Sequence, residues 1–257
     1  LHYPLRRQRQ MCIRDRTNAE RVVMLTQNPG LPPTATVRQA LTMVTKDAQH
    51  TEDLLRAAGL QELGHVSELS GGQAAQVALL RALAARPEVL VVDEPFAAMD
   101  VASAARWRHL LRLAAPERTT IIVTHSRVDL TALADDIAVM DAGEVVSQGP
   151  AERMLSRPTS RFVAQLAGMN LLRGHLRGED FSPDRNGEHW AAFTYSALHC
   201  EPQGELNATV LADLGAETLL EIDGQRVTAG QPAGGMAPGE RVAVCLDGAA
   251  LSVYPRT

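Results

Sequence analysis

Two short stretches decide the fold: residues 69–73 read Leu-Ser-Gly-Gly-Gln, and residues 89–95 read Val-Leu-Val-Val-Asp-Glu-Pro. The second stretch is apolar until its end, which is typical of a buried strand that presents Asp93 and Glu94 at its carboxyl end. The first stretch contains a Ser-Gly-Gly turn that opens a helix, and the free backbone N–H groups of such a turn suit a phosphate. Each stretch alone is a weak signal, so their order and spacing carry the interpretation.

In this order and spacing, the two stretches resemble the signature motif and the Walker B strand of the nucleotide-binding subunits of ABC transporters. Three further elements follow the order of that family. They are Gln27 after the apolar run Val22–Leu25 (similar to the Q-loop glutamine), residues 97–100 ending in Asp100 (the D-loop) and residues 121–125 ending in His125 (the switch histidine). The resemblance continues through a helical tail to about Gly168.

The resemblance implies a role for each of these residues, with ATP and Mg²⁺ as cofactors. Glu94 is implied as the catalytic base and His125 as the sensor of the γ-phosphate. Asp93 would hold Mg²⁺ through water, and Gln27 would contact both the nucleotide and the metal. The remaining implied nucleotide-binding residues are Ser70, Gly71, Gly72, Gln73 and Asp100.

Each of these residues also has a plain structural interpretation. Glu94 and His125 can be ordinary polar side chains at strand ends, and Gln27 can be a loop amide. Ser70 to Gly72 can form a simple helix start, and Asp100 can be a helix N-cap. The family usually carries one or two arginines just after the signature, whereas residues 74–76 here read Ala-Ala-Gln.

The P-loop of the family, Gly-x-x-x-x-Gly-Lys-Ser/Thr before the Q-loop, is missing from this sequence. Its single lysine is Lys46, which lies after Gln27 without a glycine frame. We therefore expect a fragment truncated at its N-terminus that does not hydrolyse ATP alone. Residues 1–16 lack apolar periodicity and resemble a translated sequencing adaptor, so we interpret them as a non-native leader; they can also be a solvated basic arm.

The pattern along the chain predicts two domains. Strands that alternate with helices predict an α/β fold with a parallel sheet and active groups at its carboxyl ends. We assign residues 17–168 to a truncated P-loop NTPase domain of the ABC type, with a helical subdomain over about residues 34–68. From about Met169, short alternating runs and the turn signals Asp223-Gly224 and Pro238-Gly239 predict a small β-barrel over residues 169–257, similar to TOBE/Mop domains.

Composition limits the class of protein. The net charge of −5 argues against a nucleic-acid partner. A membrane-spanning helix needs about 18–20 consecutive apolar residues, and every apolar run in this sequence is much shorter. The three cysteines, Cys12, Cys200 and Cys245, are scattered and fit a reducing compartment. His189, His199 and Cys200 match no defensible metal-ligand spacing.

The resemblance also implies the partners. Two ATPase subunits would face head to tail and drive a membrane permease from the cytoplasmic face of the bacterial inner membrane, with a solute-binding protein acting indirectly. Residues 168–174 and 251–255 resemble the subunits of molybdate importers most, and importers of sulfate, iron or polyamine are close to them. Two different classes of function stay open: a non-transport ABC protein acting on DNA or ribosomes, and a regulatory module that only binds an oxyanion or a partner.

Overall fold

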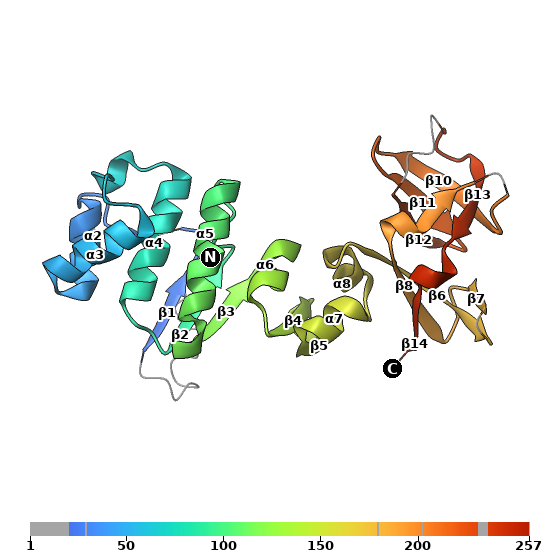
Figure 1. The fold of residues 1–257 in the computed structure, drawn as a ribbon, viewed down its shortest axis with the longest axis horizontal. Helices are drawn as coiled ribbons and strands as arrows, with labels where there is room; N and C mark the ends of the chain where they lie inside the picture. Colours follow the sequence, from blue (N-terminus) through green and yellow to red (C-terminus); the bar gives the residue numbers. More distant parts are fainter. Residues whose placement is uncertain (1–20, 29, 179, 202, 231–235, 257) are drawn as a thin grey trace, which may run out of the picture. The chain divides into compact units, whose positions relative to one another are not determined.

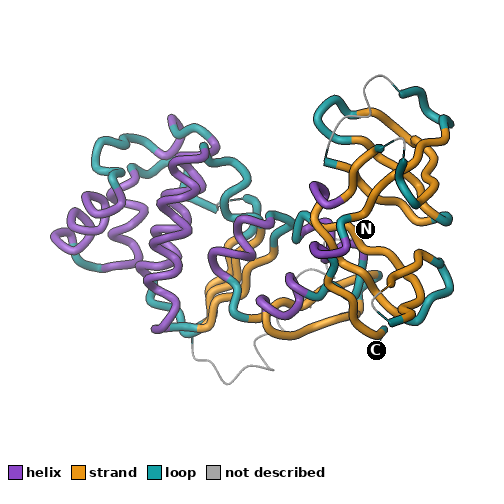
Figure 2. The backbone as a smooth tube through the Cα atoms, turned by 45° about the vertical axis from the view of Figure 1, so that its right-hand side comes forward, coloured by secondary structure: helices purple, strands orange, loops and turns teal. Residues whose placement is uncertain are grey.

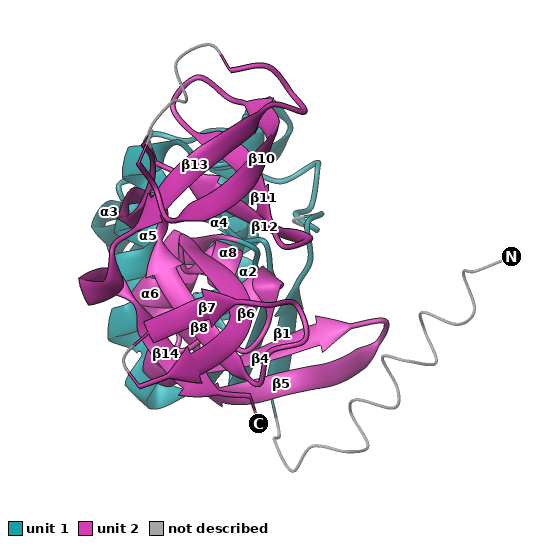
Figure 3. Ribbon diagram, turned by 90° about the vertical axis from the view of Figure 1, so that its right-hand side faces the viewer, with its two compact units in different colours: residues 1–125 teal, residues 126–257 magenta. Residues whose placement is uncertain are grey.

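The computed structural model describes residues 21–28, 30–178, 180–201, 203–230 and 236–256. The chain divides into two compact units, residues 1–125 and residues 126–257, which are coloured separately in Figure 3. The expected leader over residues 1–16, with Cys12, lies outside the described residues, as does Pro29. The first unit thus ends at His125, earlier than the boundary at residue 168 that the sequence pattern suggests.

The described part of unit 1 combines a three-stranded parallel sheet with four α-helices (Figures 1 and 2). In chain order its elements are β1 Val22–Leu25, α2 Val37–Thr45, α3 Ala48–Ala58, the 3₁₀ turn η1 Val66–Glu68, α4 Gly71–Ala84, β2 Val89–Asp93, α5 Val101–Ala114, the 3₁₀ turn η2 Ala115–Glu117 and β3 Thr119–Val123. The strand order is β1-β2-β3. The predicted α/β class and the predicted parallel sheet are confirmed.

The two faces of this sheet differ in burial. Leu90 and Val92 on β2 are fully buried, which follows from their position on the face against which the helices pack. On the opposite face, Met24 of β1 and Ile121 of β3 are each 50% exposed. Both pair with Val91 of β2, so they lie in one row across the sheet. Strand β1 is therefore only partly covered: Val22, Val23 and Leu25 are half-buried, and Met24 is exposed.

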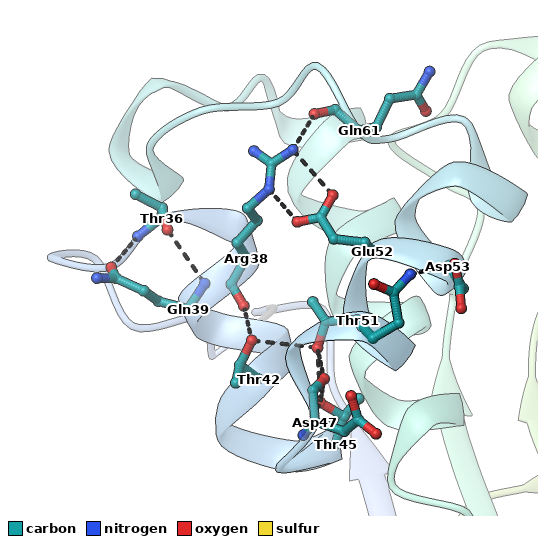
Figure 4. A network of polar contacts seen from close by, with 11 residues as sticks. Thr36, Arg38, Gln39, Thr42, Thr45, Asp47, Thr51, Glu52, Asp53 and Gln61 are labelled. Atoms are coloured by element: carbon teal, nitrogen blue, oxygen red, sulfur yellow. Dashed lines mark hydrogen bonds and ion pairs between the residues drawn. The ribbon is translucent and has the colours of Figure 1, made fainter.

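The helical hairpin α2–α3 lies within the helical subdomain that the sequence predicts over about residues 34–68. Thr36 caps α2 through a capping box with Gln39, and Gly59 ends α3 in the left-handed conformation. An ion pair between Arg38 and Glu52 joins the two helices, and Arg38 Nη2 also donates to the Gln61 carbonyl at 3.3 Å (Figure 4). The arginine holds the pKa of the Glu52 carboxyl below its usual range by hydrogen bonding to it.

Unit 2 is mainly β-structure, with short helices in its first part. Its elements are α6 Arg127–Leu133, β4 Asp136–Asp141, β5 Glu144–Pro150, α7 Ala151–Ser156, α8 Arg161–Leu166, β6 Met169–Arg177, β7 Asp180–Pro183, β8 His189–Thr194, the 3₁₀ turn η3 Tyr195–Ala197, β9 Leu198–Cys200, β10 Leu206–Asp213, β11 Thr218–Ile222, β12 Gln225–Ala229, β13 Arg241–Leu246, the 3₁₀ turn η4 Gly248–Ala250 and β14 Ser252–Pro255. A continuous run of strands thus begins at Met169, where the sequence pattern changes.

Three sheets lie in the described part of unit 2. They are the hairpin β4-β5, a five-stranded sheet β12-β11-β10-β13-β9 and a four-stranded sheet β14-β8-β6-β7. The hairpin predicted at Asp223-Gly224 is present between β11 and β12, and both turn residues have positive φ. The sequence pattern predicts β-structure here without placing β6 to β9 individually. In β8, for example, the apolar residues do not alternate, since Trp190 to Phe193 are all buried. The structure contains these sheets; a closed TOBE/Mop-type barrel remains a prediction.

Two buried side-chain amides link the larger sheets. Asn170 on β6 exchanges two hydrogen bonds with the backbone of Thr228 on β12, at 2.8 and 2.7 Å. Gln225 on β12 does the same with the backbone of Arg173 on β6, at 2.7 and 3.1 Å. Each amide therefore acts as a substitute peptide group between strands that do not form a regular ladder.

Helix α8 packs onto the four-stranded sheet through an apolar cluster of Ala164, Leu171, Trp190, Ala192 and Tyr254. The Tyr254 hydroxyl donates to the Pro158 carbonyl at 2.6 Å, and burial raises the pKa of this tyrosine. Among the described residues, we find no helix with the length and apolarity required to cross a bilayer.

We predict that Gln225→Leu destabilises unit 2 by about 2 kcal/mol, because the half-buried Arg173 backbone N–H loses the acceptor that the buried Gln225 amide provides. The measurement is urea unfolding followed by Trp190 fluorescence in a Trp107→Phe background. Gln203→Leu, at an exposed position, is the matched control and should change stability by less than about 0.5 kcal/mol. Equal effects of the two substitutions would contradict the role of the amide.

Candidate functional site

The candidate site is built where the three parallel strands of unit 1 end. Leu25 of β1 pairs with Val92 of β2, and Asp93 of β2 pairs with Val123 of β3. In a parallel sheet the carboxyl ends share one edge, so Gln27, Glu94 and His125 each follow a strand end at that edge. The pairing therefore brings the ends of three segments that are far apart in the sequence to one edge of the sheet.

Glu94 and His125 are in direct contact. Glu94 Oε1 lies 2.7 Å from His125 Nδ1 and accepts the His125 backbone N–H at 3.1 Å. An ionised carboxylate only accepts hydrogen bonds, so this contact requires the proton on Nδ1. The Glu94 side chain is 17% exposed and that of His125 is 80% exposed. The pair therefore joins a mostly shielded acid to an imidazole that solvent and ligands can reach.

The backbone of Glu94 is held in an unusual conformation. Its φ is +47°, in the left-handed region that non-glycine residues seldom occupy. The Glu94 N–H donates to the Val123 carbonyl at 2.9 Å, which ties the residue to β3 just before His125. Such strain costs about 1–3 kcal/mol and is concentrated at functional sites. The conformation turns the chain sharply out of β2 while keeping the carboxylate at the strand end.

The Leu-Ser-Gly-Gly-Gln segment opens α4 with a complete capping box. Ser70 Oγ accepts from the Gln73 backbone N–H at 3.2 Å, and Gln73 Oε1 accepts from the Ser70 N–H at 2.9 Å. Gly72 is required for close approach, since a Cβ there would lie 2.7 Å from the Ala98 carbonyl oxygen. The signature segment and the residues just before Asp100 thus pack against each other in one unit.

Asp100 is the N-cap of α5. Its Oδ1 accepts from the Ser103 backbone N–H at 2.9 Å. Hydrogen bonds from the Ser103 side chain and backbone hold the pKa of the Asp100 carboxyl below its usual range. The structural interpretation of Asp100 as a cap is confirmed, and its contact with a nucleotide stays a prediction.

Asp93 and Gln27 suit a magnesium ion in chemistry, although they do not form a cage. Asp93 is the last residue of β2, and the exposed Gln27 follows β1 in a bend. Carboxylate and amide oxygens are ligands that Mg²⁺ accepts, and this ion is usually held by one or two protein groups together with substrate phosphates. The described residues contain no cluster of three or more His, Cys, Asp or Glu side chains that would hold an ion alone.

Lys46 does not take part in this site. It ends α2 as a left-handed C-cap with φ +58°, and its N–H donates to the Thr42 carbonyl. A helix C-cap has no row of free N–H groups for phosphate, so Lys46 does not replace a P-loop lysine.

Gln76 belongs to the site region, although its sequence context marks it only as a departure from the family pattern. Its side-chain oxygen accepts from Trp107 Nε1 at 3.1 Å and from Arg106 Nη2 at 3.0 Å. Gln76 is 7% exposed and Trp107 is fully buried. This amide therefore fastens α4, which begins at the signature, to α5, which begins at Asp100. The unusual glutamine could have been matched to the tryptophan only through the helix packing.

Comparison with known proteins identifies relatives of this chain. The model of the ABC transporter family matches residues 6–97, which begins inside the segment interpreted as a leader. The molybdenum import ATP-binding protein ModC of Mycobacterium tuberculosis is 42% identical over 125 residues, which is 48% of this chain and 34% of that protein.

Two further importer proteins match over longer stretches. The sulfate/thiosulfate import ATP-binding protein CysA of Nocardia farcinica is 36% identical over 68% of this chain and 54% of its own length. The Fe(3+) ions import ATP-binding protein FbpC 1 of Rhodococcus jostii is 34% identical over 73% of this chain and 61% of its own length. The chain thus spans between about a third and three fifths of these relatives.

A solved structure is also similar, a dimeric post-hydrolysis state of an ATP-binding cassette bound to ADP and Pi. It has a TM-score of 0.47 and 24% sequence identity, and the match covers 51% of this chain and 63% of that one.

We predict that Gln76→Leu lowers the free energy of unfolding of unit 1 by about 1–3 kcal/mol, because it leaves the buried Trp107 N–H without an acceptor. Urea unfolding followed by Trp107 fluorescence in a Trp190→Phe background measures this. Gln76→Glu retains an acceptor, so its free energy of unfolding should fall by less. Gln49→Leu, on the exposed side of α3, should leave the free energy of unfolding almost unchanged. A Gln76→Leu protein as stable as the Gln49→Leu control would refute the assignment.

Proposed function

We propose that this chain, a member of the ABC transporter ATPase family, serves as an ATP-binding subunit that energises a bacterial importer. The observation that carries the proposal is the contact between Glu94 and His125 at the ends of two adjacent parallel strands. An acid that adjoins a histidine at this edge, on the same unit as a capped signature helix, suits water activation beside a phosphate.

In this proposal Glu94 accepts a proton from the attacking water. Because His125 donates two hydrogen bonds to Glu94 Oε1, the second carboxylate oxygen is the one assigned to the water. The exposed imidazole of His125 contacts the γ-phosphate through Nε2, since Nδ1 is engaged by Glu94. Asp93 and Gln27 are the residues that would hold Mg²⁺, and the bound ion would neutralise phosphate charge.

Two subunits share the work in the proposed assembly. Lys46 is a helix cap, so the described residues provide no lysine for the β- and γ-phosphates. The signature segment, by contrast, is complete and locally rigid. We therefore assign Ser70, Gly71, Gly72 and Gln73 to the nucleotide held by a second subunit, in a head-to-tail pair with Asp100 near the interface.

The permease, the solute-binding protein and the location at the cytoplasmic face of the inner membrane belong to the same proposal. The importer names of the relatives support a permease partner, and the helical hairpin α2–α3 is the element assigned to its contact. The Arg38–Glu52 pair joins the two helices of this hairpin (Figure 4).

Molybdate is the proposed cargo. The resemblance of residues 168–174 and 251–255 to molybdate-importer subunits is what favours this ion. Overall identity does not separate the ions, because it is 42% over 125 residues to the molybdenum protein and 40% over 127 residues to the sulfate/thiosulfate import ATP-binding protein CysA of Synechocystis. The matches to CysA of Nocardia farcinica and to FbpC 1 cover more of this chain, at 68% and 73%. An importer of sulfate or iron is therefore the second candidate, and binding experiments must separate the ions.

We predict that the 257-residue chain alone releases no phosphate from Mg-ATP, whereas a mixed dimer with an intact homologue retains one active composite site. Ser70→Arg in this chain should abolish that residual activity, because it places bulk and charge at the γ-phosphate. Glu94→Gln in this chain should leave it unchanged, since its Glu94 belongs to the other site. Phosphate release measures both.

Co-purification of the two chains controls for assembly in each mixture. Equal sensitivity to the two substitutions would overturn the assignment of the signature to the partner's nucleotide.

We predict that the chain binds molybdate or tungstate more tightly than sulfate, in unit 2 and through backbone N–H groups and hydroxyls. Calorimetric titration of the full chain with each ion measures this. Tight sulfate binding without molybdate binding would favour the second candidate. If the chain binds neither ion, unit 2 gives no support to an oxyanion cargo.

A further inference from the structure

Three arginines gather where α8 meets the four-stranded sheet of unit 2. Arg173 on β6 is the cross-strand partner of Trp190 on β8, and Arg256 follows β14, the strand on the other side of β8. The guanidinium carbon of Arg173 lies 4.9 Å from the centroid of the Trp190 ring, and that of Arg256 lies 5.3 Å from it. Arg161, the first residue of α8, is close enough for its charge to act on Arg173. We refer to Arg161, Arg173 and Arg256 as the arginine cluster.

The positive charge of the arginine cluster is not neutralised by ion pairs in the described part of the chain. None of its three members forms an ion pair there, and Arg256 Nη1 donates to the uncharged Gly187 carbonyl at 3.3 Å. Burial, followed by the charges of Arg256 and Arg161, holds the pKa of the Arg173 guanidinium below its usual value. The three like charges therefore repel one another, and an anion placed among them would relieve this repulsion.

A ligand can reach the donors of the arginine cluster. The guanidinium nitrogens of Arg173 have no hydrogen-bond acceptor among the described residues, and none of them is fully buried. Arg161 and Arg256 are exposed. Stacking on the nearly buried Trp190 ring occupies the face of a guanidinium and leaves the N–H groups at its edge free. The ring therefore holds the guanidinium groups in place while their donors stay available.

The number of charges favours a phosphate group as the ligand. The fork of an arginine matches both carboxylate and phosphate oxygens. A carboxylate carries one negative charge, whereas a phosphate monoester carries about 1.5 to 2 and offers oxygens to more than one guanidinium. The whole chain has a net charge of −5, so a long polyanion would be repelled by the rest of the surface. A single phosphate group thus fits the cluster better than a carboxylate or a nucleic acid.

We propose that the arginine cluster binds a phosphate group, either as free phosphate or as the phosphomonoester headgroup of a lipid. The phosphate oxygens accept from Arg173 and Arg256 beside Trp190, and Arg161 adds charge. A ligand that binds only the folded state also stabilises it, so phosphate should raise the stability of unit 2. This site goes beyond the importer function, because it requires neither ATP nor the transported ion.

The test uses the full chain with Trp107→Phe, so that Trp190 beneath the arginine cluster is the only tryptophan. Sodium phosphate is titrated at constant pH and ionic strength, with sodium chloride as the balancing salt. We expect a saturable change in Trp190 fluorescence with a Kd of about 1 mM, which is reasonable for an ion of about five heavy atoms. In a second arm, vesicles of phosphatidylcholine with and without phosphatidic acid replace the free phosphate.

Three substitutions locate the binding. Arg173→Gln and Arg256→Gln should each lower the affinity for phosphate at least tenfold. Arg241→Gln removes the same charge from an exposed position on β13 and is the matched control, so it should change the affinity by less than about twofold. If Arg173→Gln fails to fold, the comparison of the exposed Arg256 and Arg241 positions still decides.

The two arms also distinguish the source of the phosphate group. A signal with free phosphate assigns a soluble ligand, and a signal only with phosphatidic acid vesicles assigns a lipid headgroup. The absence of a saturable signal in both arms would overturn the proposal. Equal losses of affinity in Arg256→Gln and Arg241→Gln would overturn it as well, since the binding would then follow net charge and not the arginine cluster.

Discussion

The parallel pairing of β1, β2 and β3 is the constraint on which the rest of unit 1 depends. Parallel strands need long crossover connections, and here the crossovers carry the helical hairpin, the signature helix and α5. The same pairing makes three strands end at one edge. Gln27, Glu94 and His125 are functional candidates because each is the exit from one of these strands.

Backbone strain at Glu94 and helix caps near this edge fix where the chain leaves β2 and where α4 and α5 begin. The left-handed backbone of Glu94 lets the chain leave β2 at once, and the hydrogen bond to the Val123 carbonyl couples it to β3. The capping box at Ser70 and the N-cap at Asp100 set where α4 and α5 begin. Gln76 then fixes these helices to each other through Trp107, so one amide couples the signature to the segment before α5.

Unit 2 uses polar side chains for a related purpose. Asn170 and Gln225 join β6 to β12 where the backbone ladders do not, so these hydrogen bonds connect the two larger sheets. Polar residues are rare in a core because an unmatched donor is costly, and here each amide is matched by backbone groups. Arg118 in unit 1 is the contrasting case, since one of its donors is buried without an acceptor among the described residues.

The sequence by itself determined the elements whose signals are local. The start of α4 at Ser70, the hairpin at Asp223-Gly224 and the strand ending in Asp93 depend on residues close together in the chain, and all were predicted. Tertiary structure alone decided the features that depend on partners far along the chain. These are the Glu94–His125 contact, the Gln76–Trp107 bond, the open face of β1 and the bounds of the strands β6 to β9. These features depend on burial and on hydrogen bonds between elements that are far apart in the sequence, and no local pattern of residues encodes such contacts.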